Sequence, residues 1–549
     1  MQHDIKTAVV YQIYPKSFYS HHGNATGDLA GVIDKLDYLA WLGVDYLWLT
    51  PFFQSPQQDN GYDISDYYAI DPAYGTMADL ERLIAEAKSR GIGLMLDIVV
   101  NHTSTAHAWF RQARQGRDNP YRDFYIWRDT PNNWQSKFGG SAWEFDADSG
   151  QYYLHLFDKT QADLNWANPA VRQAVYAMMR FWADKGVAGF RLDVINLISK
   201  PGDFPEDHSD GRRFYTDGPR IHDYLQEMHR EVFAGRDLLT VGEMSSTSMT
   251  HCIDYTQPTR RELSMVFNFH HLKVDYPNGE KWVAAPFDFI ELKRILSAWQ
   301  VGMVSGGGWN ATFWCNHDQP RVVSRFGDDG RYRVESAKML ASVLHGLRGT
   351  PYIYQGEEIA MANPGFTRID DYRDVESLNA WHALRAQGVA AEAVLAAIRQ
   401  KSRDNARTPM QWDNGPHAGF SRVAPWIDVA PDADRVNVAA ALADPGSVLH
   451  HYRQLIALRK RHPIFADGDY RCLTPEHPAI WAYLRASEAA RLLVIANFRA
   501  EPQDFDPPLA PLPVGWRWRL LSANLPASPD QPGPLRLRPY EALIYLAER

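Results

Sequence analysis

Gly189-Phe190-Arg191-Leu192-Asp193 follows a long amphipathic segment and has the pattern of a short buried strand that ends in an acid. A carboxylate at the end of such a strand, two residues after an arginine, is a charged pair at the edge of a core. That placement suits chemistry better than packing. An isolated Arg–Asp pair would more often be a simple ion pair. Here, however, the pattern of a strand followed by a polar residue recurs along the chain, and the repetition favours a functional site.

Eight short runs rich in strand-forming residues occur in the chain, and several are almost continuously apolar, as expected of strands buried on both faces. Helical patterns such as residues 29–42, 77–90 and 168–185 lie between them, so strands and helices alternate. Eight such units predict an α/β fold, a (β/α)8 TIM barrel, whose active site lies at the carboxyl ends of its strands. The predicted strands span residues 9–13, 44–49, 92–99, 187–192, 238–241, 264–269, 311–314 and 351–354.

Two further regions depart from this alternating pattern. We expect residues 1–102 and 168–465 to form the barrel, with an irregular insertion at about 363–426. Residues 103–167 are rich in Trp, Tyr, Asn, Gly and Pro and lack a helical period, which predicts an inserted domain over the barrel mouth. Residues 466–549 alternate as strands do and predict a separate, C-terminal antiparallel β domain.

The bulk composition excludes several classes of protein. A chain of 549 residues with a net charge of −9 is long enough for two or three domains and is unsuited to general binding of nucleic acid or anionic membranes. Its three cysteines have no metal-ligand spacing, which favours inert thiols in a reducing compartment. We see no signal-like apolar run at the N-terminus and no segment of about 18 consecutive apolar residues. We therefore expect a cytoplasmic protein. A monomer is a separate expectation.

Polar side chains stand at the ends of four predicted strands. Because the carboxyl ends of barrel strands meet at one mouth, three of the acids, Asp193, Glu243 and Asp318, should converge there. Glycosidic bond cleavage needs paired carboxyl groups. One protonates the leaving oxygen, and the other attacks or stabilises the oxocarbenium-like centre. The four strand ends are Asp97-Ile98-Val99-Val100-Asn101-His102, Arg191 with Asp193, Gly242-Glu243, and Asn316-His317-Asp318.

On these residues the chain resembles the alpha-amylase family of glycoside hydrolases. The family's signature regions match as DIVVNH (97–102), GFRLD (189–193), VGE (241–243) and NHD (316–318), with QADLN (161–165) in the inserted domain. The resemblance implies that Asp193 is the nucleophile, Glu243 the general acid and then base, and Asp318 a stabiliser that grips sugar hydroxyls. It also implies a retaining mechanism, with the Asp193 and Glu243 carboxyl groups about 5 to 5.5 Å apart.

The same resemblance implies a glucose-binding pocket around these acids. His102, Arg191 and His317 would surround the reacting glucose. In the segment 58–63, Asp59 would bind hydroxyls at the non-reducing end and Tyr62 would stack on the ring. Arg407 matches the arginine that pairs with that aspartate, and such a pair would close the pocket to longer chains. The enzyme would then remove single glucose units.

Within the family the chain looks closest to the oligo-1,6-glucosidase group, and within that group to enzymes that cleave α,α-trehalose 6-phosphate. The matching stretches are residues 199–200 with 204–207, 210–220, 242–248 and 267–276. The resemblance therefore implies hydrolysis of a phosphorylated disaccharide, α,α-trehalose 6-phosphate, to glucose and glucose 6-phosphate.

A charge argument supports a phosphorylated substrate. After the sixth strand, where glucosidases acting on neutral sugars typically carry acids, this chain has His270 and Lys273. A phosphate of about −1.5 to −2 charge is poorly tolerated beside carboxylates unless cations offset it. The candidates for binding the phosphate are Arg212, Arg213, His270, His271, Lys273 and Lys281.

Two alternatives stay open. Val194, directly after Asp193, resembles the residue found in enzymes that tolerate α-1,6 linkages, so an α-glucosidase or transglucosidase acting on isomaltose or sucrose is a rival. A non-catalytic module with an amylase fold, used for binding or transport, is another. Such modules usually lose catalytic acids or gain a membrane anchor.

No cofactor or metal is expected. The loop at residues 20–28 occupies the place where relatives often carry an acidic calcium loop. Asp28 is its only carboxylate. Calcium prefers several charged oxygens, so we predict no tight calcium site in this loop.

Overall fold

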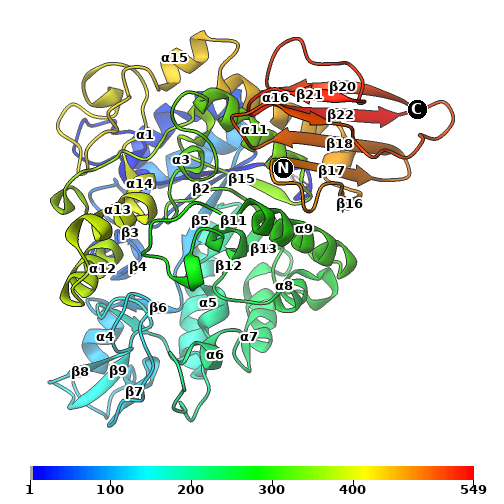
Figure 1. Cartoon of the computed structure of the whole chain (residues 1–549). Coiled ribbons are helices and arrows are strands. Elements are labelled where there is room, and N and C mark those ends of the chain that lie inside the picture. Colours follow the sequence, from blue (N-terminus) through cyan, green and yellow to red (C-terminus); the bar gives the residue numbers. More distant parts are fainter. Residues whose placement is uncertain (1–3) are drawn as a thin grey trace.

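A barrel of eight parallel strands forms the centre of the molecule, a computed structural model that describes residues 4–549 (Figure 1). Neighbouring strands follow the order β13-β12-β11-β5-β2-β1-β15-β14. A parallel bridge between Val266 of β13 and Asn310, directly before β14, completes the ring. The predicted (β/α)8 barrel is thus confirmed. Its strands are β1 Val10–Ile13, β2 Tyr46–Leu49, β5 Gly93–Ile98, β11 Gly189–Leu192, β12 Leu239–Met244, β13 Met265–Asn268, β14 Ala311–Thr312 and β15 Thr350–Tyr354.

The helices around the barrel follow the predicted pattern with one break. The segment expected as one helix at 29–42 is divided into α1 and α2 at Lys35. Before β11, the side chain of Asn168 accepts a hydrogen bond from the Ala170 N–H and Pro169 opens α5, two ordinary signals for a helix start. The main helices of the barrel are α1 Leu29–Asp34, α2 Leu36–Leu42, α3 Met77–Ser89, α5 Pro169–Asp184, α7 Ile221–Met228, α8 Met249–Thr256, α9 Phe289–Ser305, α11 Arg333–Gly346 and α16 Val448–Arg461.

The segment between β5 and α5 forms a small body of its own at the lower left of Figure 1. It contains α4 Ala108–Ala113, a three-stranded antiparallel sheet and a two-stranded ribbon. Val194 and Leu197, from the segment after β11, share a small core with Trp134 and Trp143 of this body. The inserted domain therefore packs directly on the chain that follows Asp193. Its strands are β6 His102–Ser104, β7 Trp127–Arg128, β8 Trp143–Asp146, β9 Gln151–Leu154 and β10 Gln161–Asp163.

The region expected to be irregular at 363–426 is partly helical. It contains α12 Val375–Ala386, α13 Ala391–Lys401 and the short α14 Asp404–Arg407. The expectation of irregular backbone is wrong for α12 and α13. Gly388 lies between them with a positive φ of 86°, a conformation typical of the residue that follows the end of a helix, so α12 and α13 are separate helices.

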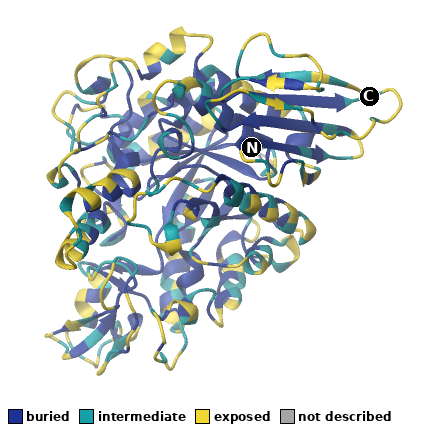
Figure 2. Cartoon of the chain, in the orientation of Figure 1, coloured by how far each residue is buried: buried dark blue, intermediate teal, exposed yellow. Residues whose placement is uncertain are grey.

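The last part of the chain is an antiparallel sheet in the order β16-β17-β18-β22-β20, as predicted. Figure 2 shows its central strands buried. One face of β18 packs with the barrel core through residues such as Leu492 and Val494, and the other packs in a separate cluster through Leu493 and Ile495. The strands are β16 Asp469–Cys472, β17 Ile480–Ala486, β18 Ala490–Asn497, β20 Arg517–Ala523 and β22 Ala542–Glu548, with β19 Gln503–Phe505 and β21 Leu535–Leu537 paired separately. Among residues 4–549 there is no helix with the length and apolarity that a membrane crossing requires.

Candidate active site

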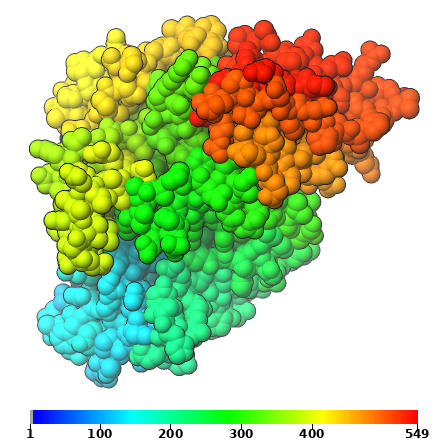
Figure 3. Space-filling view, viewed as in Figure 1, coloured from blue at the N-terminus to red at the C-terminus, as the bar shows by residue number. Residues whose placement is uncertain are grey.

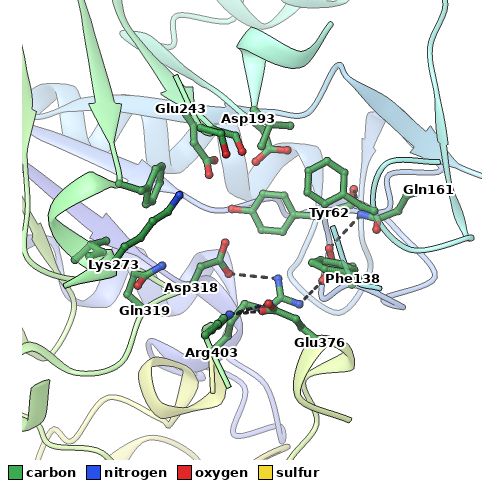
Figure 4. A pocket seen from close by; sticks show the side chains of 18 of the residues that line it. Tyr62, Phe138, Gln161, Asp193, Glu243, Lys273, Asp318, Gln319, Glu376 and Arg403 are labelled. Atoms are coloured by element: carbon green, nitrogen blue, oxygen red, sulfur yellow. Dashed lines mark hydrogen bonds and ion pairs between the residues drawn. The ribbon is translucent and has the colours of Figure 1, made fainter. Parts of the chain in front are cut away.

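A cavity of about 270 Å³ opens at the carboxyl ends of the barrel strands. In Figure 3 the cyan inserted domain and the yellow-green segment around α12 lie on the same side of the molecule. Asp193 follows β11, Glu243 lies near the end of β12, and Asp318 follows β14; all three line this cavity (Figure 4). The three predicted acids therefore share one pocket.

Arg191 lies beneath two of these acids and is 1% exposed. Its guanidinium contacts Asp97 at 2.8 Å and Asp193 at 2.6 Å, and it also pairs with Glu243. Asp97 accepts further hydrogen bonds from Tyr62 and Trp48, as a carboxylate would. One positive charge cannot offset three buried negative charges, so at least one of the three groups should keep a proton.

Glu243 is the group that best holds that proton. Burial raises the pKa of its carboxyl group, and the nearby charges of Asp193 and Asp318 raise it further, although Arg191 opposes them. Because the acids around Arg191 outnumber its single positive charge, the pKa of Glu243 stays raised. A carboxyl group that stays protonated at neutral pH can serve as a proton donor.

Asp318 has the opposite environment. Arg407 contacts its carboxylate at 2.7 Å and Arg403 contacts it at 3.5 Å. Burial opposes ionisation of Asp318, but His317 and these two guanidinium groups outweigh it and hold its pKa below its usual range. The pocket thus places a protonated carboxyl group and an ionised one on either side of the space for a sugar.

The floor of the pocket corrects one prediction. Asp59 pairs with Arg403, at 3.0 Å, whereas Arg407 contacts Asp318. Arg403 directly precedes the single helical turn α14, and Arg407 ends it. Residues four apart lie on the same side of a helix, so both arginines reach one acidic cluster. The prediction that Arg407 pairs with Asp59 is therefore wrong, because Arg403 makes that pair.

Two other predicted sugar-binding residues, Tyr62 and His102, also lie in the pocket. Tyr62 lines the pocket, and its ring lies parallel to that of His317, with the ring centroids 5.2 Å apart. His102 also lines the pocket, and its Nε2 lies 3.2 Å from the Tyr62 carbonyl oxygen and 3.2 Å from Gln161 Nε2. Gln161 in turn donates to Asp59 at 3.1 Å. The signature segment of the inserted domain therefore contributes to the pocket floor.

Two predicted cations line the pocket, and a third that sequence reasoning missed lies beside them. Figure 4 shows Lys273 pointing into the pocket on the Glu243 side. Lys281 also lines it, but Glu376 contacts its ammonium group at 2.6 Å. Lys137, from the inserted domain, donates to Ser245 Oγ at 3.0 Å. It lies in a segment without periodicity, so no sequence pattern marked it.

Lys137, Lys273 and Arg212 form what we call the basic cluster. Burial, together with the positive charges of Arg212 and Lys273, lowers the pKa of Lys137 to about 7, although Asp210 and Glu243 oppose this shift. Arg212 pairs with Asp210 at 3.1 Å and does not line the cavity. Burial lowers the pKa of Lys273, and the positive charge of Arg212 lowers it further. The three cations are close enough to repel one another next to Glu243, an arrangement that an anion would relieve.

The other three candidate cations do not line the pocket. Arg213 pairs with Asp207 at 2.8 Å and is largely exposed. The His270 ring packs on Trp299, with centroids 5.1 Å apart. His271 is 3% exposed and bonds through Nε2 to the Phe313 carbonyl. Burial lowers the pKa of His271 to about 3, so its ring supplies no positive charge, and this candidate for binding the phosphate does not line the pocket.

A buried lysine connects the inserted domain to the barrel. Lys200 Nζ contacts Asp163 Oδ2 at 2.7 Å and Asn101 Oδ1 at 2.7 Å. Asn101 also donates to Asp163, at 3.1 Å. Asp163 ends β10 of the inserted domain, Asn101 follows β5, and Lys200 follows β11. One ammonium group therefore joins three segments around the pocket.

Comparison with known proteins agrees with this site. The family model described as the alpha amylase catalytic domain matches residues 12–468. Trehalose-6-phosphate hydrolases of Bacillus subtilis and Escherichia coli are each 58% identical, over 98% and 100% of this chain and 97% and 99% of theirs. The crystal structure of trehalose-6-phosphate hydrolase from Bacillus licheniformis matches with a TM-score of 0.96 at 56% identity, covering 99% of both chains. The protein therefore belongs to the alpha-amylase family of glycoside hydrolases.

Proposed function

We propose that this protein hydrolyses α,α-trehalose 6-phosphate to glucose and glucose 6-phosphate. The observation that carries the proposal is the basic cluster beside Glu243. The relatives at 58% identity that are named trehalose-6-phosphate hydrolases support it. The three acids in one pocket argue against a non-catalytic module.

The proposed reaction has two steps and retains the configuration at C1 of the glucose. Asp193 attacks C1 while Glu243 gives its proton to the departing glycosidic oxygen, so the C1–O bond breaks and glucose 6-phosphate leaves. Glu243, now ionised, takes a proton from water as the water oxygen attacks C1. The bond between C1 and the Asp193 carboxylate breaks in the same step, which frees Asp193 and releases glucose. A separation of about 5 to 5.5 Å between the Asp193 and Glu243 carboxyl groups stays a prediction.

The floor of the pocket supports removal of a single glucose unit. Asp59 with Arg403, and Asp318 with Arg407, place two ion pairs at the closed end. The uncharged glucose would lie against these pairs and accept or donate hydrogen bonds through its hydroxyls. The phosphorylated half would extend toward the basic cluster, because positive charges offset the negative charge of a phosphate.

Removing the charge of Lys273 tests the phosphate assignment. Lys273→Met is expected to lower kcat/KM for trehalose 6-phosphate about 10- to 100-fold, the loss of one charge-assisted hydrogen bond of about 1.5–3 kcal/mol. Hydrolysis of 4-nitrophenyl α-glucoside, which has no phosphate, should change little. Initial rates on both substrates measure the effect. Lys88→Met, on α3 at the other end of the barrel, is the matched control. An equal loss on both substrates would contradict the assignment.

A glucosidase acting on neutral sugars is the second candidate. Val194 lines the pocket directly after Asp193, and an oligo-1,6-glucosidase of Parageobacillus thermoglucosidasius is 50% identical over 98% of both chains. Turnover of isomaltose faster than that of trehalose 6-phosphate would favour this candidate. A cytoplasmic location and a monomeric state also stay predictions.

We further propose that the loop at residues 20–28 holds no calcium. Asp28 caps α1 by accepting from the Gly31 N–H at 2.6 Å, and its other oxygen lies 3.0 Å from His22 Nδ1. Its oxygens are thus already engaged, and calcium needs six to eight oxygen ligands. Calorimetric titration with calcium is expected to show no micromolar binding. Thermal unfolding should give the same Tm with and without calcium. Micromolar binding would contradict the proposal.

A further inference from the structure

Asp217 is a buried carboxylate that the reaction does not use. It lies after the short helix α6 Arg212–Tyr215, and its side chain is 6% exposed. It accepts hydrogen bonds from Asn196 Nδ2 at 3.0 Å, Thr247 Oγ1 at 2.9 Å and the Tyr255 hydroxyl at 2.6 Å. Asn196 and Thr247 belong to the two segments that carry Asp193 and Glu243.

Asn196 connects these two segments a second time. It lies three residues after Asp193 and is fully buried. Its Oδ1 accepts from the Ser245 N–H at 2.9 Å, and its Nδ2 donates to the Ser245 carbonyl at 2.9 Å. Its own carbonyl accepts from the Asp217 N–H at 3.0 Å. The Asn196 amide is therefore fixed by Asp217 on one side and holds the backbone of Ser245 on the other.

The segment held in this way is the wall of the pocket next to Glu243. Ser245 and Ser246 line the cavity, and Ser246 has a positive φ of 56°, an unfavourable conformation for a serine. Asp217 holds this turn at both ends, at Ser245 through Asn196 and at Thr247 directly. Ser245 also receives the hydrogen bond from Lys137 of the inserted domain.

We propose that Asp217 is a positioning residue, which fixes the end of β12 so that Glu243 meets the departing oxygen while Asp193 meets C1. The proposal rests on the roles given above to Asp193 and Glu243, and it holds for either candidate substrate. A displacement of about 1 Å in a reacting group can lower a rate about 100-fold, so a carboxylate outside the pocket has a measurable influence on the chemistry.

The test uses two unphosphorylated substrates that differ mainly in the acidity of the leaving group. Phenyl α-glucoside needs proton donation from Glu243, whereas 4-nitrophenyl α-glucoside leaves as a stable anion and needs much less. Asp217→Asn keeps a residue that tolerates the positive φ of 50° at this position. It is expected to lower kcat/KM about 10- to 100-fold for the phenyl compound. For the nitrophenyl compound, the loss in kcat/KM should be several-fold smaller.

Two further variants separate positioning from a loss of folding. Thr247→Val removes one link to the wall and should shift the two substrates in the same unequal way, by a smaller factor. Tyr255 donates a hydrogen bond to Asp217 but belongs to neither of the two segments. In Tyr255→Phe, both rates should therefore stay within about twofold of those of the native enzyme. Equal losses on both substrates in Asp217→Asn would overturn the proposal.

A Glu243→Gln control shows whether a failed prediction is due to the role given to Asp217 or to the role given to Glu243. If Glu243→Gln shows the unequal loss and Asp217→Asn does not, the role of Asp217 is wrong and the proposed mechanism stands. If Glu243→Gln itself shows equal losses, the role of Glu243 as proton donor is wrong.

Discussion

Glu243→Gln is expected to lower kcat/KM for trehalose 6-phosphate about 10²- to 10⁴-fold, the usual contribution of a positioned general acid. The amide cannot give up a proton to the departing sugar oxygen, and it cannot take one from water in the second step. Steady-state kinetics of glucose 6-phosphate release measures the loss. Attack by Asp193 does not depend on this proton when the leaving group is already stable, so 4-nitrophenyl α-glucoside should keep far more of its rate of glycosylation.

The pH profile of the native enzyme carries the same information. Because burial raises the pKa of Glu243, the protonated form persists at neutral pH, and activity should be lost as the pH rises through that pKa. On phenyl α-glucoside, which needs proton donation from Glu243, this basic limb should be present in the native enzyme and absent from the residual activity of Glu243→Gln. Glu376→Gln is the matched control, since Glu376 lines the same pocket but pairs with Lys281. A basic limb that survives in Glu243→Gln would assign it to another group.

The parts of this site that sequence predicted are those fixed by the barrel itself. A barrel strand directs its carboxyl end to one mouth wherever the strand lies, so Asp193, Glu243 and Asp318 were brought together by strand order alone. Even a two-residue strand such as β14 suffices to place Asp318. The (β/α)8 pattern therefore predicts which acids lie together at the mouth of the barrel, without giving the distances between them.

The parts that sequence missed depend on contacts between segments far apart in the chain. Arg403 and Arg407 belong to one short motif, and only the packing of α14 shows which of them meets Asp59. Lys137 comes from an aperiodic part of the inserted domain and meets Ser245, 108 residues later. His271 looked like a cation in the sequence, but burial beside Phe313 keeps its ring neutral. A residue that is charged in water can be neutral in a site, because burial and neighbouring groups shift its pKa.

Lys200→Met is expected to destabilise the attachment of the inserted domain by about 3–5 kcal/mol, the usual consequence of removing one partner from a buried ion pair. Lys200 and Asp163 are almost completely buried, with side chains 3% and 0% exposed. Without the ammonium group, the hydrogen bonds left to offset the buried charge of Asp163 within residues 4–549 would be those from Asn101 and the Leu156 N–H. Limited proteolysis within residues 103–167, together with urea denaturation, measures the effect.

Two comparisons show whether the loss comes from the unpaired charge. Lys185→Met breaks a pair with Glu81 that is partly exposed to solvent, so it should cost only about 0–1 kcal/mol. Adding Asp163→Asn to Lys200→Met removes the charge left behind, and the double variant should be more stable than the sum of the single losses predicts. Because residues from β10 and from the segments after β5 and β11 meet at this ammonium group, its loss should also weaken the pocket floor and raise KM for every glucoside. A Lys200→Met protein with native stability and native KM would show that the packing of Val194 and Leu197 against Trp134 and Trp143 suffices to hold the inserted domain in place.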